Sequence, residues 1–178
     1  MYFISLITIL ALAAIVFAAA LFLFVSVYAT IISFYKGAPY VRSKKARVET
    51  MLELADIKEG ERIVDLGSGD GLILIEAAKR GAYATGIEIN PFLVWYSKRH
   101  VKKSGVGERI KIIKSDFRKH DLGEADVVFL YLWPSTNEGL EHKFSRELRP
   151  GTRVISNGFP LPGLEPHASK NGVHVYYY

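Results

Sequence analysis

The pattern of apolar and polar positions divides the chain into two unequal parts. From Tyr2 to Tyr35 the residues are uncharged and mostly apolar, whereas beyond residue 36 apolar and polar positions alternate in short blocks. Gly37-Ala38-Pro39 lies between the two parts, and Gly and Pro interrupt helices. We therefore expect an apolar anchor at residues 1–35, a basic linker at 36–46 and one folded domain at 47–178.

Within the folded part, short apolar blocks alternate with amphipathic ones. Residues 44–55 carry apolar side chains at helical spacing, which predicts a helix before the first strand. The pattern then predicts strands at 62–66, 84–89, 110–115, 126–132 and 153–156, with helices at 72–80, 91–103 and 136–148. Alternating strands and helices are typical of an α/β domain with a parallel sheet covered on both faces.

The C-terminal segment departs from this alternation. Residues 167–170 and 173–178 flank Asn171-Gly172, a dipeptide favoured in two-residue β-hairpin turns. A hairpin at the sheet edge makes one strand antiparallel to its neighbours. We therefore expect seven strands, of which the last two form an antiparallel hairpin.

The apolar part is long enough to cross a membrane. As one helix it would reach roughly 50 Å, more than the hydrocarbon core of about 30 Å. A cleavable signal peptide would need a basic start and a shorter apolar stretch. Basic residues follow the apolar part and none precedes it; they are Lys36, Arg42, Lys44, Lys45 and Arg47. By the positive-inside rule this predicts a single-pass membrane protein whose folded domain is on the cytoplasmic side.

Composition narrows the chemistry. The chain has no cysteine, which excludes disulfides, thiolate metal sites and a cysteine nucleophile. The five histidines show no metal-ligand spacing, so we expect no metal. The net charge of +5 is modest for a nucleic-acid-binding protein, which makes nucleic acid an unlikely partner and suits a domain near anionic lipid.

One glycine-rich loop predicts a cofactor site at the end of the first strand. Its residues are Asp65, Leu66, Gly67, Ser68, Gly69, Asp70 and Gly71. Open α/β sheets bind ligands at the carboxyl ends of their strands, and glycines let the backbone approach the ligand. The Gly-x-Gly-x-Gly spacing differs from the dinucleotide fingerprint. Two flanking aspartates suit a sulfonium and an ammonium better than a pyrophosphate, which favours S-adenosylmethionine.

Later strand ends add further candidates for cofactor binding. Glu88 ends the second predicted strand, where an acidic side chain can accept hydrogen bonds from ribose hydroxyls. Asn90 precedes Pro91 and is expected to cap the next helix, with a less direct role toward the cofactor. Asp116 and Phe117 follow the third strand, where they would meet the adenine; alternatively, Asp116 caps a turn.

The end of the fourth predicted strand is expected to face the reacting methyl group. Tyr131 and Trp133 alternate with Leu132, so they would share one side of the strand. Aromatic rings there can position an amine, although core packing explains such rings equally well. Asn137 is a further polar candidate for catalysis.

With these residues assembled, the chain resembles the small archaeal protein-lysine methyltransferases and their membrane-anchored mitochondrial relatives. The likeness includes Pro39-Tyr40-Val41, residues 64–71, Glu88-Ile89-Asn90-Pro91 and Phe159-Pro160-Leu161-Pro162. It implies the Rossmann-like seven-strand sheet of class I methyltransferases, S-adenosylmethionine as cofactor, Tyr40 as a cover over that cofactor, and a protein substrate with an accessible lysine.

Other functions stay open at this point. The same chemistry can serve a lipid or small-molecule acceptor, and a non-catalytic protein that only binds S-adenosylmethionine would share the loop. An NAD-dependent dehydrogenase is the remaining enzyme class. The oligomeric state is not indicated by the sequence.

Overall fold

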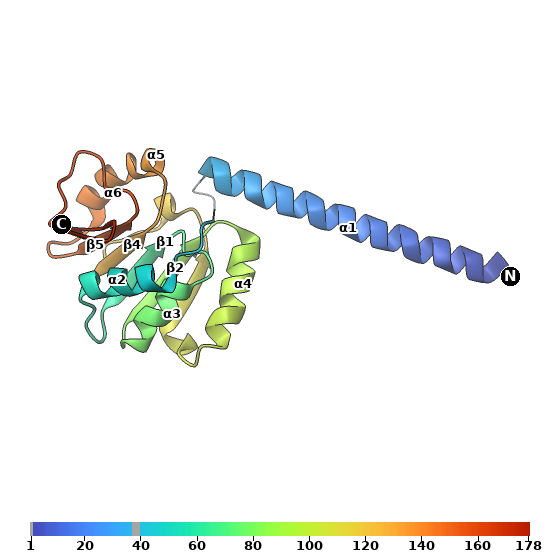
Figure 1. Cartoon of the computed structure of the whole chain (residues 1–178), viewed down its shortest axis with the longest axis horizontal. Helices are drawn as coiled ribbons and strands as arrows, with labels where there is room; N and C mark the ends of the chain where they lie inside the picture. The colour runs from blue at the N-terminus through green and yellow to red at the C-terminus, as the bar shows by residue number, and fades with distance from the viewer. Residues whose placement is uncertain (1, 37–39) are drawn as a thin grey trace.

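Seven strands form one mixed sheet in the computed structural model, which describes residues 2–36 and 40–178 and, at positions 2–4, 29, 30 and 32–36, no side chains. The strands are β1 (Arg62–Leu66), β2 (Tyr83–Glu88), β3 (Ile110–Lys114), β4 (Val127–Leu130), β5 (Arg153–Asn157), β6 (Ala168–Lys170) and β7 (Val173–Tyr177). Their order is β3-β2-β1-β4-β5-β7-β6 (Figure 1), with β7 antiparallel to β5 and to β6 and the other neighbours parallel. The expected seven-strand sheet with a C-terminal hairpin is confirmed.

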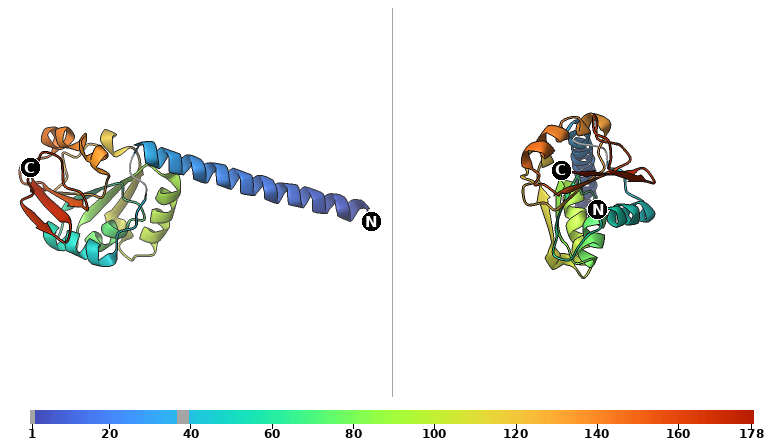
Figure 2. Two further views of the ribbon diagram at one scale, coloured as in Figure 1. Left: turned by 45° about the horizontal axis from the view of Figure 1, so that its top comes forward. Right: turned by 90° about the vertical axis from the view of Figure 1, so that its left-hand side faces the viewer.

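Helices cover both faces of this sheet. They are α2 (Lys45–Ala55), α3 (Leu72–Lys79), α4 (Pro91–Lys102), α5 (Pro134–Asn137) and α6 (Leu140–Glu147), with short 3-10 turns η1 (Gly107–Arg109) and η2 (Phe117–Lys119). α2, α3 and α4 lie on one face, and α5 and α6 lie on the other (Figure 2). Side chains of β1 alternate between the two cores: Ile63 packs with α2 and α3, and Val64 packs with α6.

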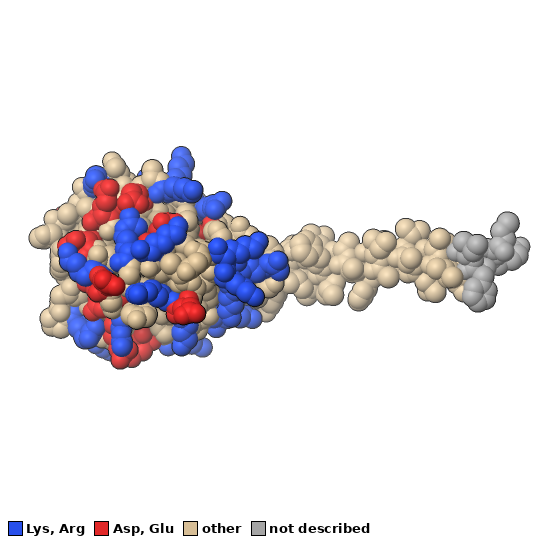
Figure 3. Space-filling model, turned by 90° about the horizontal axis from the view of Figure 1, so that it is seen from below, with Lys and Arg blue, Asp and Glu red and all other residues tan. Residues whose placement is uncertain are grey.

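The helix α1 (Tyr2–Lys36) extends away from the domain as a rod, and its C-terminal end comes near α4 (Figure 1). Its segment Ser5–Tyr28 is long and apolar enough to cross a membrane, and none of it is buried. A secretory signal meets the same criteria of length and composition, but the lack of burial distinguishes this segment from a core helix. Lys and Arg gather at the end of the domain that adjoins the rod (Figure 3).

Two sequence predictions differ from the structure. β4 ends at Leu130, not at residue 132, because its neighbours offer no further partners: Leu130 pairs with Leu66, after which β1 turns away into the glycine loop. The single helix predicted at 136–148 is two helices, α5 and α6, separated at Gly139, since glycine is a poor helix former. The break predicted at residues 37–39 lies outside the described residues.

Candidate cofactor and acceptor site

The glycine loop joins β1 to α3 and is held against the end of β2. The backbone N–H groups of Gly67 and Ser68 donate to the carbonyl of Ile87 at 2.9 and 3.1 Å. Gly71 begins α3 with a φ of 77°, in the left-handed region that favours glycine. The loop therefore has a fixed conformation at the carboxyl edge of the sheet, where the sequence predicted a ligand.

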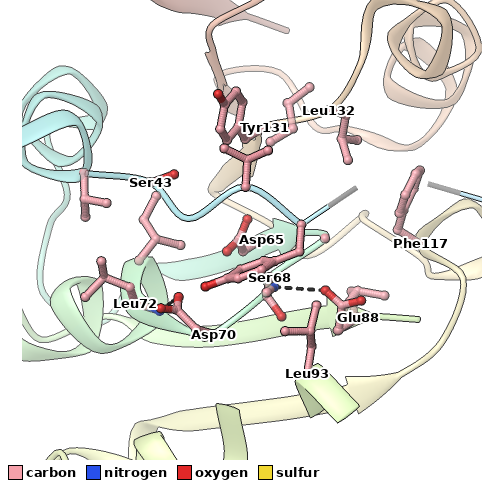
Figure 4. A pocket seen from close by; sticks show the side chains of 18 of the residues that line it. Ser43, Asp65, Ser68, Asp70, Leu72, Glu88, Leu93, Phe117, Tyr131 and Leu132 are labelled. Carbon is pink, nitrogen blue, oxygen red and sulfur yellow. Dashed lines mark hydrogen bonds between the residues drawn. The ribbon is translucent and has the colours of Figure 1, made fainter. Parts of the chain in front are cut away.

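Glu88 lies opposite this loop, at the end of β2. Its two carboxylate oxygens accept backbone N–H groups from different segments, Oε2 from Gly69 at 2.9 Å and Oε1 from Asn90 at 2.8 Å (Figure 4). The side chain is buried and lines the same pocket as the loop. Glu88 thus connects the glycine loop to the start of α4 across the pocket.

Three buried carboxylates lie around this pocket: Asp65, Asp70 and Glu88 (Figure 4). Burial, and to a lesser extent the neighbouring charges of Glu88 and Asp70, raises the pKa of Asp65 to about 8. Burial also raises the pKa of Glu88, although its backbone donors lower it in part. Because a bound cation would stabilise the charged forms of these groups, the pocket suits a positively charged ligand.

Residues 40–43 cross over the loop from the N-terminal side. A Cβ atom at Gly69 would lie 2.7 Å from Cε2 of Tyr40, so only a glycine allows this ring to lie on the loop backbone. Burial, and next the Asp70 carboxylate, raises the pKa of Tyr40 to about 12. Nε of Arg42 pairs with Oδ2 of Asp70 at 2.9 Å. The segment after the anchor is thereby attached to the pocket, and Tyr40 lies where a cover was expected.

The opposite wall of the pocket includes Phe117, Tyr131 and Leu132 (Figure 4). Phe117 is buried, whereas Tyr131 is 37% exposed and its ring packs on the backbone of Gly158, where a Cβ atom would lie 3.0 Å from Cε2. Tyr131 is therefore an aromatic side chain between the buried pocket and solvent.

The structure separates the other two candidates for catalysis from Tyr131. Because β4 ends early, Trp133 does not share a strand face with Tyr131; it stacks on Phe159, with ring centroids 6.1 Å apart, and does not line the pocket. Asn137 is fully buried in α5, and within the described residues its carboxamide has no hydrogen-bond partner. Neither Trp133 nor Asn137 is brought to the pocket wall.

Two predicted cofactor residues also face away from the pocket lining. Asn90 caps α4 as expected, accepting from the N–H groups of Phe92 and Leu93. Asp116 accepts the backbone N–H of Arg118 at 3.0 Å and pairs with its guanidinium, so it caps η2, which was the alternative considered. The remaining predicted cofactor residues except Gly71 line the pocket; they are Tyr40, Asp65, Gly67, Ser68, Gly69, Asp70, Glu88 and Phe117.

Sequence reasoning missed some residues that shape this site. Gly86, in β2, is needed because a Cβ atom there would lie 2.5 Å from Oγ of Ser68 and from Leu74. An isolated glycine inside a strand is a recognised signal of close approach. Val48 and Met51 of α2 also line the pocket, and their helical spacing indicated only that they would be buried.

Comparisons with known proteins agree with this geometry. The profile of the ANTKMT methyltransferase domain matches residues 65–168. A protein-lysine N-methyltransferase from Saccharolobus islandicus is 39% identical over 136 residues, which cover 75% of this chain and 84% of that protein. The ATP synthase c-subunit lysine N-methyltransferase of Homo sapiens is 36% identical over 156 residues, which cover 84% of this chain and 66% of that protein.

A solved relative identifies the ligand of the pocket. The structure of an RNA methyltransferase from Salinibacter ruber, in complex with S-adenosyl-L-homocysteine, has a TM-score of 0.72 and 40% identity, covering 78% of this chain and 92% of that one. That ligand is the demethylated form of S-adenosylmethionine, which fits the glycine loop and acidic pocket. The chain belongs to the ANTKMT methyltransferase family and is an S-adenosylmethionine-dependent methyltransferase.

Proposed function

We propose that this chain is a membrane-anchored protein-lysine methyltransferase. In this proposal α1 spans a bilayer, residues 36–46 connect it to the catalytic domain at 47–178, and the acceptor is a lysine close to the bilayer surface. The domain faces the cytoplasmic side, on the basis of the basic residues that follow α1. One observation carries the proposal: a single chain joins this methyltransferase pocket to an unburied apolar segment of 24 residues.

The names of the relatives support lysine as the acceptor. The Saccharolobus islandicus and human proteins are both named lysine N-methyltransferases, and the human one acts on a membrane-protein component, the c-subunit of ATP synthase, by its name. The solved Salinibacter ruber relative is instead named an RNA methyltransferase, which makes RNA the alternative acceptor. The modest charge of the chain and its apolar α1 favour a protein acceptor at a membrane.

The residues of the pocket have separate roles in this proposal. Glu88 receives ribose hydroxyls, Asp65 and Asp70 face the positive charges of the cofactor, Phe117 lies against the adenine, and Tyr40 covers the site. Bound S-adenosylmethionine supplies a methyl group on a positively charged sulfur, which a neutral amine displaces.

Tyr131 would position the incoming lysine in line with that methyl group, and such positioning supplies much of the rate. The acceptor nitrogen must first lose a proton, because a lysine ammonium has no free electron pair and an ordinary pKa of about 10.4. The carboxylates of the pocket lie at the end assigned to the cofactor, so solvent takes this proton.

A label-transfer experiment tests the acceptor. The full chain, reconstituted in vesicles, is incubated with radiolabelled S-adenosylmethionine, membrane proteins and RNA, and label is then measured in protein, lipid and RNA fractions. We expect label in protein, recovered as methyl-lysine after hydrolysis. Label in RNA or in lipid without methyl-lysine would overturn the lysine proposal and leave the methyltransferase activity in place.

A further inference from the structure

The outer face of α4 carries exposed aromatic side chains. Phe92, Trp95 and Tyr96 are 55%, 53% and 41% exposed, while the inner face of the helix is buried through Leu93 and Val94. The Phe92 ring lies against both other rings, with centroids 5.9 and 6.5 Å away. Contiguous exposed aromatic side chains of this kind mark a contact surface.

Basic side chains continue this face toward the C-terminal end of α4. Lys98, Arg99, Lys102 and Lys103 are all exposed, and the Arg99 guanidinium lies 5.0 Å from the centre of the Trp95 ring. Residues 89–107 contain no Asp or Glu, so no acidic side chain of this segment offsets them. We call these seven residues, Phe92, Trp95, Tyr96, Lys98, Arg99, Lys102 and Lys103, the α4 surface.

The position of the α4 surface indicates its partner. α4 runs along the side of the domain from which α1 departs, and its axis crosses the direction of α1 (Figure 1). Basic residues gather at this same end of the domain (Figure 3). A bilayer spanned by α1 would therefore lie against this end. Trp and Tyr are enriched at membrane interfaces, and Lys and Arg are attracted to anionic headgroups.

We propose that the α4 surface binds the anionic headgroup layer of the membrane that α1 crosses, a proposal that rests on the membrane placement proposed above. The buried side of α4 contributes Leu93 to the cofactor pocket, and Nδ1 of His100 lies 3.2 Å from the carbonyl of Asp70 in the glycine loop. Membrane contact through α4 thus fixes the orientation of the pocket relative to the bilayer.

The two tryptophans of the chain provide a matched test. In the full chain, Trp133→Phe leaves Trp95 as the sole tryptophan reporter, and Trp95→Phe leaves Trp133 as the control. Both proteins are reconstituted in phosphatidylcholine vesicles with or without phosphatidylglycerol, and quenching by headgroup-attached spin labels is measured. We expect strong quenching of Trp95 in anionic vesicles only, reduced by high salt, and little quenching of Trp133.

Charge reversal tests the electrostatic part. Each basic side chain near an anionic surface contributes about fivefold in binding, so Lys98→Glu with Lys102→Glu is expected to reduce Trp95 quenching to the level of the Trp133 control. Equal quenching in neutral vesicles, or a Trp95 signal that responds to an RNA oligonucleotide and not to vesicles, would overturn the proposal.

The outcomes distinguish the α4 surface from the anchor. Retention of the chain in vesicles after carbonate extraction reports insertion of α1 independently of Trp95. An inserted chain without Trp95 quenching overturns the role of the α4 surface alone. A chain that carbonate extracts overturns the anchor, and with it the basis for the α4 surface.

Discussion

The backbone N–H of Gly69 donates to Oε2 of Glu88 at 2.9 Å and so joins the glycine loop to the end of β2. The other oxygen of this carboxylate accepts the N–H of Asn90 at the start of α4. One buried acidic side chain therefore holds together the two segments between which the cofactor is expected to bind, and it still has lone pairs for ribose hydroxyls.

Replacing Glu88 by Gln tests this arrangement. Gln has the same shape, but its amide group would face one backbone N–H, and the charge that strengthens these hydrogen bonds is lost. Hydrogen bonds to charged groups contribute about 1.5–3 kcal/mol, so we expect affinity for S-adenosylmethionine to fall about 10- to 100-fold in calorimetry. Glu108→Gln, at an exposed position, is the control and should bind normally. Equal affinities of the two variants would contradict the role of Glu88.

A methyl group at Gly69 should disturb the cover formed by Tyr40. Gly69→Ala would place Cβ 2.7 Å from the Tyr40 ring, so the ring must move, and we expect S-adenosylmethionine to bind at least about tenfold more weakly. Gly105→Ala is the matched control, because Gly105 also has a positive φ but has open space around it. It should lose stability only.

Tyr40→Ala separates the cause of the Gly69 effect. If the clash with the ring is responsible, adding Gly69→Ala to Tyr40→Ala should cost little further affinity, since neighbouring substitutions are not additive. Additive losses in the double variant would show that Gly69 acts independently of Tyr40.

The pKa of Asp65 predicts a pH dependence of cofactor binding. With a pKa of about 8 in the free chain, Asp65 is mostly protonated at pH 6.5 and must release its proton when it faces a cation. Affinity for S-adenosylmethionine should therefore rise as pH increases from about 6 toward 8, by up to about tenfold per pH unit. Above pH 8 Asp65 is already charged in the free chain and adds no further increase.

Calorimetry in buffers of different ionisation enthalpy measures this proton release directly. Asp65→Asn has no proton to release at this position, so its binding should be weaker, and its affinity should vary less with pH over the same range. The same pH slope in Asp65→Asn and the wild type would show that another group is responsible.

The ring of Tyr131 is expected to act on the acceptor rather than on the cofactor. Loss of the ring in Tyr131→Ala should lower kcat about 10- to 100-fold through lost positioning, whereas Tyr131→Phe keeps the ring and should keep most of the rate. The affinity for S-adenosylmethionine, measured in parallel, should change less than kcat in both variants. A Tyr131→Ala enzyme with normal kcat would exclude this role.

The part of the site that follows strand and helix periodicity was predictable from the sequence. Asp65, Gly69 and Glu88 follow strand ends that apolar blocks located to within a residue, and the hairpin at Asn171-Gly172 has the positive φ values, 53° and 68°, that its turn type requires. These features depend on local sequence and on the common edge of a parallel sheet.

Contacts between distant segments were not predictable in the same way. The ion pair of Arg42 with Asp70 depends on how residues 40–43 return over the loop, and no local pattern encodes that path. The separation of Tyr131 from Trp133 follows from where the neighbours of β4 end, which period-two alternation cannot indicate. Side-chain pairing across the fold thus decided which candidates line the pocket.

Quantitative mass spectrometry of membrane proteins tests the central claim most directly. Cells that produce the full chain are compared with cells that produce the Glu88→Gln variant at an equal level, and methylated lysines are measured in the membrane fraction. The proposed function predicts at least one lysine, near a bilayer surface, that is methylated only with the unmodified chain. An identical set of methylated lysines in both cells, together with methylation of RNA or lipid that depends on Glu88, would contradict it.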